Sequence, residues 1–284
     1  MKSGFISIIG RPNVGKSTLL NGILGEKIAI ATSKPQTTRN TIRGIYTTGD
    51  CQMVFIDTPG IHKPKTKLGN FMTDSALNTF KEVDLVLFLV DDSLSQGPGD
   101  KYIVEMLKNI NTPKFLVINK MDKINPEDYE KIYNEYEQTG IFDEIFPVSA
   151  LEQKNIDILL ESIEKFMPEG PQYFPSDMIT DHPERFIVSE ILREKVLMFL
   201  EDEVPHGVAI EIESFQEEER VTRISAVVYC EKKSHKGIII GQGGRKLKGI
   251  GKSAREEIEA LLGNKVFLQL WVKVKENWRN SDFA

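Results

Sequence analysis

The segment Gly10-Arg-Pro-Asn-Val-Gly-Lys-Ser17 joins a short apolar run, Phe5–Ile9, to an amphipathic stretch that begins at Lys16. It fits the pattern G-x-x-x-x-G-K-[ST] between a strand and a helix. Glycines let the backbone curve around phosphate oxygens, and the N–H groups of the loop and the following helix present partial positive charge. We therefore predict a phosphate-binding loop, in which Lys16 reaches the β- and γ-phosphates and the Ser17 hydroxyl holds Mg²⁺. The predicted nucleotide contacts of this loop are Asn13, Gly15, Lys16, Ser17 and Thr18.

Residues 1–167 alternate short apolar runs with amphipathic stretches. The apolar runs are rich in β-branched and aromatic residues, as in strands buried on both faces of a sheet. The expected strands are Phe5–Ile9, Thr41–Thr47, Val54–Ile56, Leu85–Val90, Phe115–Ile118 and Ile145–Val148. The expected helices are Lys16–Leu24, Leu68–Phe80, Gly99–Asn109, Pro126–Gln138 and Asn155–Phe166. Their order predicts an α/β domain with a mostly parallel sheet and helices on both faces.

A base-reading segment, Asn119-Lys-Met-Asp122, directly follows the expected strand Phe115–Ile118. The Asp122 carboxylate can accept hydrogen bonds from both the N1–H and the N2 amino group of guanine, and adenine lacks both donors. A site built on such bonds discriminates strongly, because the wrong base leaves the carboxylate without partners. Asn119 is expected to bridge the base and the phosphate-binding loop, and the Lys120 stem to lie over the ring. Ser149 and Ala150 are candidates to offer backbone N–H groups to the guanine O6.

Two further segments are expected to sense the γ-phosphate. Asp57-Thr-Pro-Gly60 follows the strand Val54–Ile56, so that Asp57 would hold Mg²⁺ through water and the Gly60 N–H would touch the γ-phosphate. Loss of that phosphate would release the loop that follows. Upstream, Thr37 and Thr38 are candidates for a second Mg²⁺ hydroxyl, with Thr38 favoured. The predicted catalytic residues are Lys16, Thr38 and Gly60, and the predicted metal ligands are Ser17, Thr38 and Asp57.

The pattern changes after residue 167. Residues 168–183 contain four prolines and no periodicity, which predicts a linker. Residues 184–284 then read as a smaller α+β domain. Its expected elements are a helix over Arg185–Leu200, strands over Val208–Ile212 and Val221–Val228, a short helix, a Gly-rich loop within Ile238–Gly244, a helix that ends near Leu262, and a last strand over Val266–Val274.

The Gly-rich segment Gly237–Lys248 contains Gly-x-x-Gly between two helical stretches. Glycines let the backbone lie against phosphates, the next helix adds N–H donors, and nearby Lys and Arg supply countercharge. A loop of this kind clamps about four nucleotides of single-stranded RNA in KH domains. The alternative is a plain Gly-rich turn between two helices. The predicted RNA contacts are Ile239, Gly241, Gln242, Gly243, Gly244, Arg245, Lys246 and Lys248.

Charge and composition agree with a soluble protein that has one basic end. The net charge is −6, with 40% apolar and 27% charged residues. Residues 236–284 hold ten Lys or Arg and five Asp or Glu, a balance of +5, so the rest carries −11. Such asymmetry favours a nucleic-acid-facing domain. The two cysteines lack zinc-site spacing, and no apolar stretch approaches the ~20 residues that cross a bilayer. We expect a cytoplasmic protein, and leave open a loose contact with a membrane surface.

Together, these motifs resemble those of the translation-factor-like P-loop GTPases. In many relatives a Gln directly after Asp-x-x-Gly positions the attacking water. Ile61 occupies that place here, so we expect slow intrinsic hydrolysis. A G domain followed by a type II KH arrangement is similar to the Era family across essentially the whole chain. That resemblance implies binding to the 3′ end of the small-subunit ribosomal RNA rather than to DNA, a role in assembly of the 30S subunit, and loose membrane association. We also expect a monomer.

Two other functions are compatible with the sequence. The second domain could bind a protein through an apolar groove, which would make the chain a plain regulatory GTPase. It could also belong to an RNA-modifying enzyme that uses a GTPase motor. The second domain has no reactive Cys pair and no clustered His, and this disfavours the modifying enzyme.

Asn13 resembles the Asn that coordinates K⁺ in K⁺-stimulated relatives, so K⁺ is a further expected cofactor. We predict that K⁺ raises the rate of GTP hydrolysis above the rate in Na⁺, and that Asn13→Ala abolishes the difference. The measurement is phosphate release by wild type and variant in the two salts. Equal turnover of the wild type in both salts would contradict the prediction.

Overall fold

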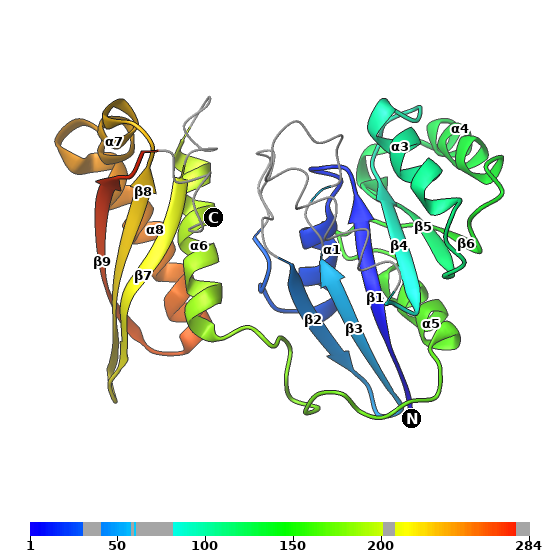
Figure 1. The fold of residues 1–284 in the computed structure, drawn as a ribbon, viewed down its shortest axis with the longest axis horizontal. Helices are drawn as coiled ribbons and strands as arrows, with labels where there is room; N and C mark the ends of the chain where they lie inside the picture. The colour runs from blue at the N-terminus through cyan, green and yellow to red at the C-terminus, as the bar shows by residue number, and fades with distance from the viewer. Residues whose placement is uncertain (31–40, 58–59, 61–81, 201–207, 277–284) are drawn as a thin grey trace. The chain divides into compact units, whose positions relative to one another are not determined.

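The computed structural model describes residues 1–30, 41–57, 60, 82–200 and 208–276 (Figure 1). Thr37, Thr38, Ile61 and the expected helix Leu68–Phe80 lie outside these residues. The chain divides into two compact units, Met1–Asp181 and His182–Ala284. Among the described residues, no helix combines the length and the apolar character needed to span a membrane.

The first unit is built on a six-stranded sheet with the order β2-β3-β1-β4-β5-β6. Its strands are β1 (Lys2–Gly10), β2 (Ile42–Thr47), β3 (Cys51–Asp57), β4 (Leu85–Val90), β5 (Lys114–Ile118) and β6 (Glu144–Pro147). All neighbours are parallel except β2, which runs antiparallel to β3. The mostly parallel sheet predicted from the sequence is therefore confirmed.

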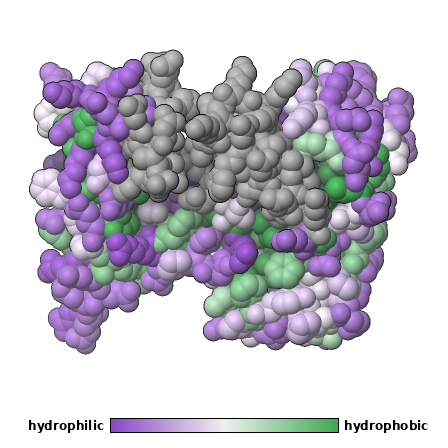
Figure 2. Space-filling view, in the orientation of Figure 1, coloured by the Kyte–Doolittle hydropathy of each residue, from purple (hydrophilic) through white to green (hydrophobic). Residues whose placement is uncertain are grey.

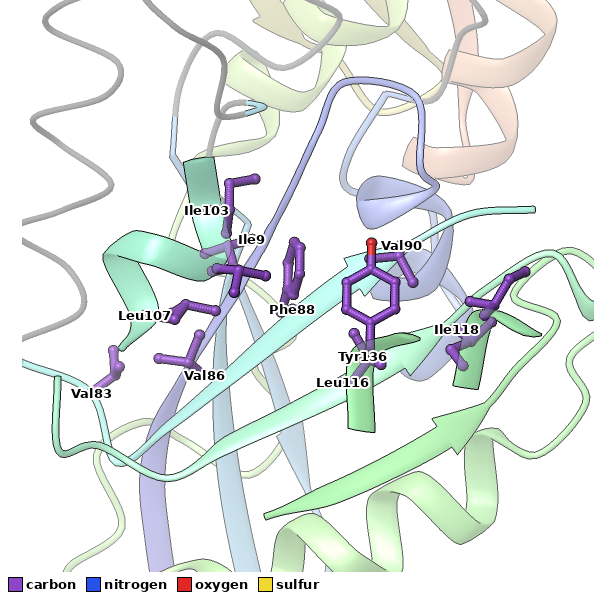
Figure 3. Packing of buried hydrophobic residues seen from close by; sticks show 12 residues of the cluster. Ile9, Val83, Val86, Phe88, Val90, Ile103, Leu107, Leu116, Ile118 and Tyr136 are labelled. Carbon is purple, nitrogen blue, oxygen red and sulfur yellow. The ribbon is translucent and has the colours of Figure 1, made fainter. Parts of the chain in front are cut away.

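Helices cover both faces of this sheet. They are α1 (Lys16–Leu24), α3 (Pro98–Leu107), α4 (Pro126–Glu137) and α5 (Ile156–Phe166). One face packs Phe88 and Leu116 against α3 and α4 in the cluster of Figure 3, which includes Ile103 and Tyr136. The preceding residue of β5, Phe115, points to the other face and contacts Phe166 of α5, with ring centroids 4.8 Å apart. Alternate residues thus serve opposite cores, which explains why the strands read as unbroken apolar runs.

The carboxyl ends of the parallel strands meet at one edge of the sheet. Asp57 at the end of β3 pairs with Ile8, and Gly10 at the end of β1 pairs with Leu89 near the end of β4. Ile118 at the end of β5 pairs with Pro147. Because ligands of open α/β sheets bind outside this edge, a ligand site is expected in the loops that follow these strands.

The stretch 168–183, expected to be a linker, follows strands of the first unit. Ser3 donates its backbone N–H to the Pro168 carbonyl, and Ile45 donates to that of Ile179. Gln52, fully buried on β3, makes four hydrogen bonds: its amide nitrogen donates to the Thr47 hydroxyl and the Phe174 carbonyl, and its oxygen accepts from the N–H groups of Tyr173 and Phe174. One side chain therefore holds two residues of this stretch against the sheet.

In its described residues, the second unit packs three α-helices against a three-stranded sheet of order β7-β8-β9. The elements are α6 (Glu184–Phe199), β7 (Val208–Glu217), β8 (Val221–Cys230), α7 (Lys233–Ile240), α8 (Arg245–Leu262) and β9 (Lys265–Val274). β7 is antiparallel to β8, and β9 is parallel to β8. A single apolar cluster, with Val196 of α6, Val228 of β8 and Ile250 of α8, joins helices and sheet. The predicted α+β class is confirmed.

We predict that Gln52→Leu lowers the free energy of unfolding by about 3 kcal/mol, because the variant removes all four hydrogen bonds of a fully buried side chain. The matched control is Gln172→Leu, an exposed residue that donates one bond to the Phe174 carbonyl at 2.7 Å. Its loss should cost less than about 0.5 kcal/mol. Equilibrium urea unfolding of the full chain measures both, and equal stabilities of the two variants would refute the assignment.

Candidate functional site

The phosphate-binding loop, Gly10–Ser17, leaves the carboxyl end of β1 and leads into α1. Gly15 has φ 104°, a region that favours glycine, and a Cβ there would overlap the side-chain nitrogen of Asn119. Gly15 is therefore required both for the backbone conformation and for the close approach of the base-reading segment. Asn13 is exposed at φ 67°, and Thr18 is half-buried in the first turn of α1.

Lys16 is buried among backbone carbonyls. Its ammonium donates to the carbonyls of Gly10 at 3.2 Å and Arg11 at 2.9 Å. Burial lowers the pKa of Lys16 to about 8, and the nearby Asp57 carboxylate partly opposes the shift. An anionic group beside the ammonium would restore its charge, so this pocket favours a ligand such as phosphate.

Ser17 and Asp57 form a pair of oxygen donors below the loop. The Ser17 hydroxyl donates to Asp57 Oδ2 at 2.8 Å, whereas the fully buried Asp57 Oδ1 has no hydrogen-bond partner among the described residues. Burial raises the pKa of Asp57 to about 6, against the opposing effects of Lys16 and Ser17. A buried carboxylate oxygen without a partner is unfavourable unless a cation satisfies it. A hydroxyl and a carboxylate are hard oxygen ligands, so the pair fits Mg²⁺.

The rest of the coordination would come from the ligand and water. In the part of the chain that the structure describes, no three His, Cys, Asp or Glu side chains cluster as a metal site. This agrees with the usual Mg²⁺ site, where one or two protein groups are joined by substrate phosphates and water. Gly60, expected near the γ-phosphate, lies against the loop: a Cβ on Gly60 would be 2.8 Å from the Pro12 nitrogen. Thr38, expected as a ligand and a catalytic residue, is outside the described residues.

Asn119 connects three loops at the carboxyl edge. Its side-chain nitrogen donates to the Val14 carbonyl at 2.9 Å, its side-chain oxygen accepts from the Ala150 N–H at 3.0 Å, and its own N–H donates to the Val90 carbonyl. The expected bridge from Asn119 to the phosphate-binding loop is thus present. Both polar atoms of the side chain contact protein partners, so Asn119 holds the loops in register.

Ser149 and Ala150, which the sequence suggested as backbone donors to the base, have protein acceptors for both N–H groups. The Ser149 N–H donates to the Lys154 carbonyl, and the Ala150 N–H donates to Asn119. Instead, the Ser149 hydroxyl donates to Asp122 Oδ1 at 2.6 Å. Ser149 therefore orients the carboxylate that is expected to read guanine. Sequence reasoning missed this role because it depends on two loops 27 residues apart.

The predicted RNA loop occupies one end of the second unit. α7 ends at Ile240, a glycine-rich loop spans Gly241–Gly244, and α8 begins at Arg245. Gly244 has φ 76°, and a Cβ there would have no atom within 4 Å, so the backbone is open to a ligand. Gly243 is also open, and Gly241 has φ 70°.

Side chains around the glycine-rich loop differ in exposure. Arg245 and Lys248 are exposed and Lys246 is half-buried. The Arg245 guanidinium donates to the side-chain oxygen of Gln242 at 3.0 Å. Ile239, expected to contact RNA, is fully buried in the core, whereas its neighbour Ile238 is 43% exposed. Ile238 rather than Ile239 is the apolar side chain available at this surface.

Charge in the second unit is separated between its two ends. The free end of the β7–β8 hairpin carries the exposed Glu217, Glu218 and Glu219, and Figure 2 shows a hydrophilic surface there. Figure 1 shows α7 and the start of α8 at the opposite end of the same sheet. An anionic ligand would therefore be attracted to the glycine-rich loop, beside the exposed Arg245 and Lys248, more than to the hairpin, where Arg220 and Arg223 accompany the three glutamates.

Comparisons with known proteins match both units of the chain. A family model described as "50S ribosome-binding GTPase" matches residues 5–120, and a KH-domain model matches residues 203–279. GTPase Era of Alkaliphilus metalliredigens is 62% identical over 98% of this chain and 95% of its own length, and GTPase Era of Clostridioides difficile is 60% identical over 98% and 95%. The chain belongs to the Era GTPase family.

Two solved Era structures share the fold of the whole chain. An Era bound to MgGDPNP and nucleotides 1506–1542 of 16S ribosomal RNA has a TM-score of 0.94 and 40% identity, and covers 99% of this chain and 96% of its own. An Aquifex aeolicus Era variant bound to GDP and AlF₄⁻ also has a TM-score of 0.94 and 40% identity, with 99% and 97% covered. The P-loop G domain and the KH domain predicted from the sequence are therefore established as the family's fold.

We predict that the affinity of this Era-family chain for GDP falls as the pH rises above about 8. Lys16 is charged below its pKa of about 8 and neutral above it. Bound phosphate favours the charged form of Lys16, so above that pH the side chain takes up one proton when GDP binds. The affinity for GDP should then fall by up to about tenfold per pH unit. Titrations with GDP from about pH 7 to about pH 9 measure the slope. Lys16→Met should bind weakly without this slope, and a wild-type affinity that is flat over the range would contradict the assignment.

Proposed function

We propose that the chain is a GTP-hydrolysing switch that binds the single-stranded 3′ end of the small-subunit ribosomal RNA and assists assembly of the 30S subunit. The observation that carries the proposal is the presence, in one chain, of a phosphate pocket with a partnerless buried carboxylate oxygen on Asp57 and of an open, basic glycine-rich loop. The related Era crystallised with MgGDPNP and a 16S ribosomal RNA fragment supports both halves.

In the nucleotide site, each side chain has a distinct task. Lys16 exchanges its two carbonyl partners for phosphate oxygens, and Ser17 and Asp57 hold Mg²⁺. The bound ion supplies charge neutralisation at the phosphates. Asp122, held by the Ser149 hydroxyl, selects guanine through two hydrogen bonds, and the Lys120 stem covers the ring.

Hydrolysis is slow because the usual water-positioning Gln is replaced by Ile61. Thr38 and Gly60 respond to the γ-phosphate, and its loss releases the segments around them. Asn13 would hold K⁺ beside the phosphates, and the ion would supply positive charge that offsets part of the missing Gln contribution.

In the second unit, the glycine-rich loop lies against the RNA backbone. Gly243 and Gly244 let phosphates approach the main chain, and the first turn of α8 adds N–H donors. Arg245 and Lys248 supply countercharge, and the exposed Ile238 contacts bases. A protein partner is the second candidate, but the basic residues beside bare glycine backbone favour an anionic chain.

We predict that Gly244→Asp abolishes binding of a short single-stranded RNA from the small-subunit rRNA 3′ end, because it adds a negative charge where phosphate approaches. Gly244→Asn is the matched control, since Asn has nearly the same shape and also tolerates positive φ. Asn should weaken RNA binding less than Asp does, and both variants should bind GTP as the wild type does. Fluorescence titrations with labelled RNA and with labelled nucleotide provide the two measurements.

The same RNA titration, repeated with a non-hydrolysable GTP analogue and with GDP, measures the coupling between the two sites. Tighter binding in the GTP-analogue state supports the switch. RNA binding by Gly244→Asp at wild-type strength would reject the glycine-rich loop as the RNA site. Absence of RNA binding by the wild type in both nucleotide states would instead favour a protein partner.

A further inference from the structure

Arg11 lies in the phosphate-binding loop, yet its side chain pairs with carboxylates. Its Nε donates to Asp100 Oδ1 at 2.7 Å, and its Nη2 donates to Asp91 Oδ1 at 2.9 Å. The Asp100 side chain is 1% exposed and that of Asp91 14%. Charge-assisted hydrogen bonds in such shielded positions are stronger than surface ion pairs. Arg11 is thereby fixed to the end of β4 and to the start of α3.

The side chain of Arg11 fixes the backbone that holds Lys16. The Arg11 carbonyl is the closer of the two acceptors of the Lys16 ammonium. Gly99 in α3 leaves the room that Arg11 needs, because a Cβ there would be 2.9 Å from Arg11 Cδ. The loop conformation on the phosphate side therefore depends on carboxylates that do not touch phosphate.

Asp91 also reaches the base side of the site. Its second oxygen, Oδ2, lies 3.4 Å from the Lys120 ammonium. Lys120 has φ 63°, so its backbone conformation is restrained as well as its side chain. Asp91 directly follows β4, the strand between β1 and β5, and so lies between the loops that follow those two strands. One carboxylate thus contacts a residue of the phosphate-binding loop and the lysine expected over the guanine ring.

We propose that Asp91 is a positioning residue that couples the phosphate side and the base side of the nucleotide site through Arg11 and Lys120. The inference rests on the proposed GTP-binding function. Asp91 touches neither phosphate nor base in this role. It sets the geometry of two residues whose alignment determines how tightly any guanine nucleotide is held.

The test is the isosteric variant Asp91→Asn, which keeps the shape and removes the charge. We expect affinity for GDP to fall about tenfold, as for loss of charge-assisted hydrogen bonds, and the hydrolysis rate at saturating GTP to stay within about twofold, since uniform binding is lost. IDP lacks the 2-amino group that Asp122 reads. Because Asp91 does not touch that group, Asp91→Asn should lower the affinity for IDP by the same factor as the affinity for GDP. Asp92→Asn is the matched control: Asp92 lies 3.6 Å from Lys120 but is 41% exposed, and among the described residues the ion pairs of Arg11 are with Asp91 and Asp100.

Double-mutant cycles separate positioning from general destabilisation. If Asp91 acts through its partners, Asp91→Asn combined with Arg11→Gln, or with Lys120→Met, should weaken GDP binding by clearly less than the product of the single effects. Three results would overturn the inference: unchanged GDP affinity of Asp91→Asn, an equal effect of Asp92→Asn, or additive cycles with both partners. In each case, GDP binding by the wild type would still uphold the nucleotide site. Failure of the wild type to bind GDP would overturn the proposed function as well.

Discussion

The buried side chain of Asn119 is the contact on which the first unit's site depends. It donates to Val14 and accepts from Ala150, so it holds together the loops after β1, β5 and β6. These loops belong to strands that are parallel, and their carboxyl ends meet at one edge. The sheet brings the loops to the same place, and Asn119 sets their spacing. Gly15 has to be a glycine because this contact leaves no room for a side chain.

In the same site, the protein buries two charged side chains that have too few protein partners to neutralise them. Lys16 donates to two backbone carbonyls, and in the described part of the chain one oxygen of Asp57 has no hydrogen bond. Burial lowers the pKa of Lys16 and raises the pKa of Asp57, so both shifts favour the neutral form of the side chain. The pocket therefore disfavours the isolated charges. A phosphate with its Mg²⁺ would supply the opposite charges at both places. The pocket is therefore prepared for a ligand in a way that opposes the stability of the ligand-free state.

The second unit uses a different device for an anionic ligand. Its glycine-rich loop exposes bare backbone at the start of α8, and the exposed Arg245 and Lys248 lie beside it. Affinity for a phosphate chain then comes from main-chain approach and from scattered basic side chains, rather than from a buried pocket.

The sequence by itself determined the fold class, the strands of the parallel sheet, the phosphate-binding loop and the α+β order of the second unit. These features are encoded in local patterns, because periodicity reports burial and glycines report backbone shape. Only the tertiary structure decided the partners. Arg11 meets Asp91 because β1 and β4 are adjacent, Ser149 meets Asp122 because two loops converge, and Ile239 rather than Ile238 turns into the core. Side-chain partners across loops depend on strand adjacency and burial, which no local pattern contains.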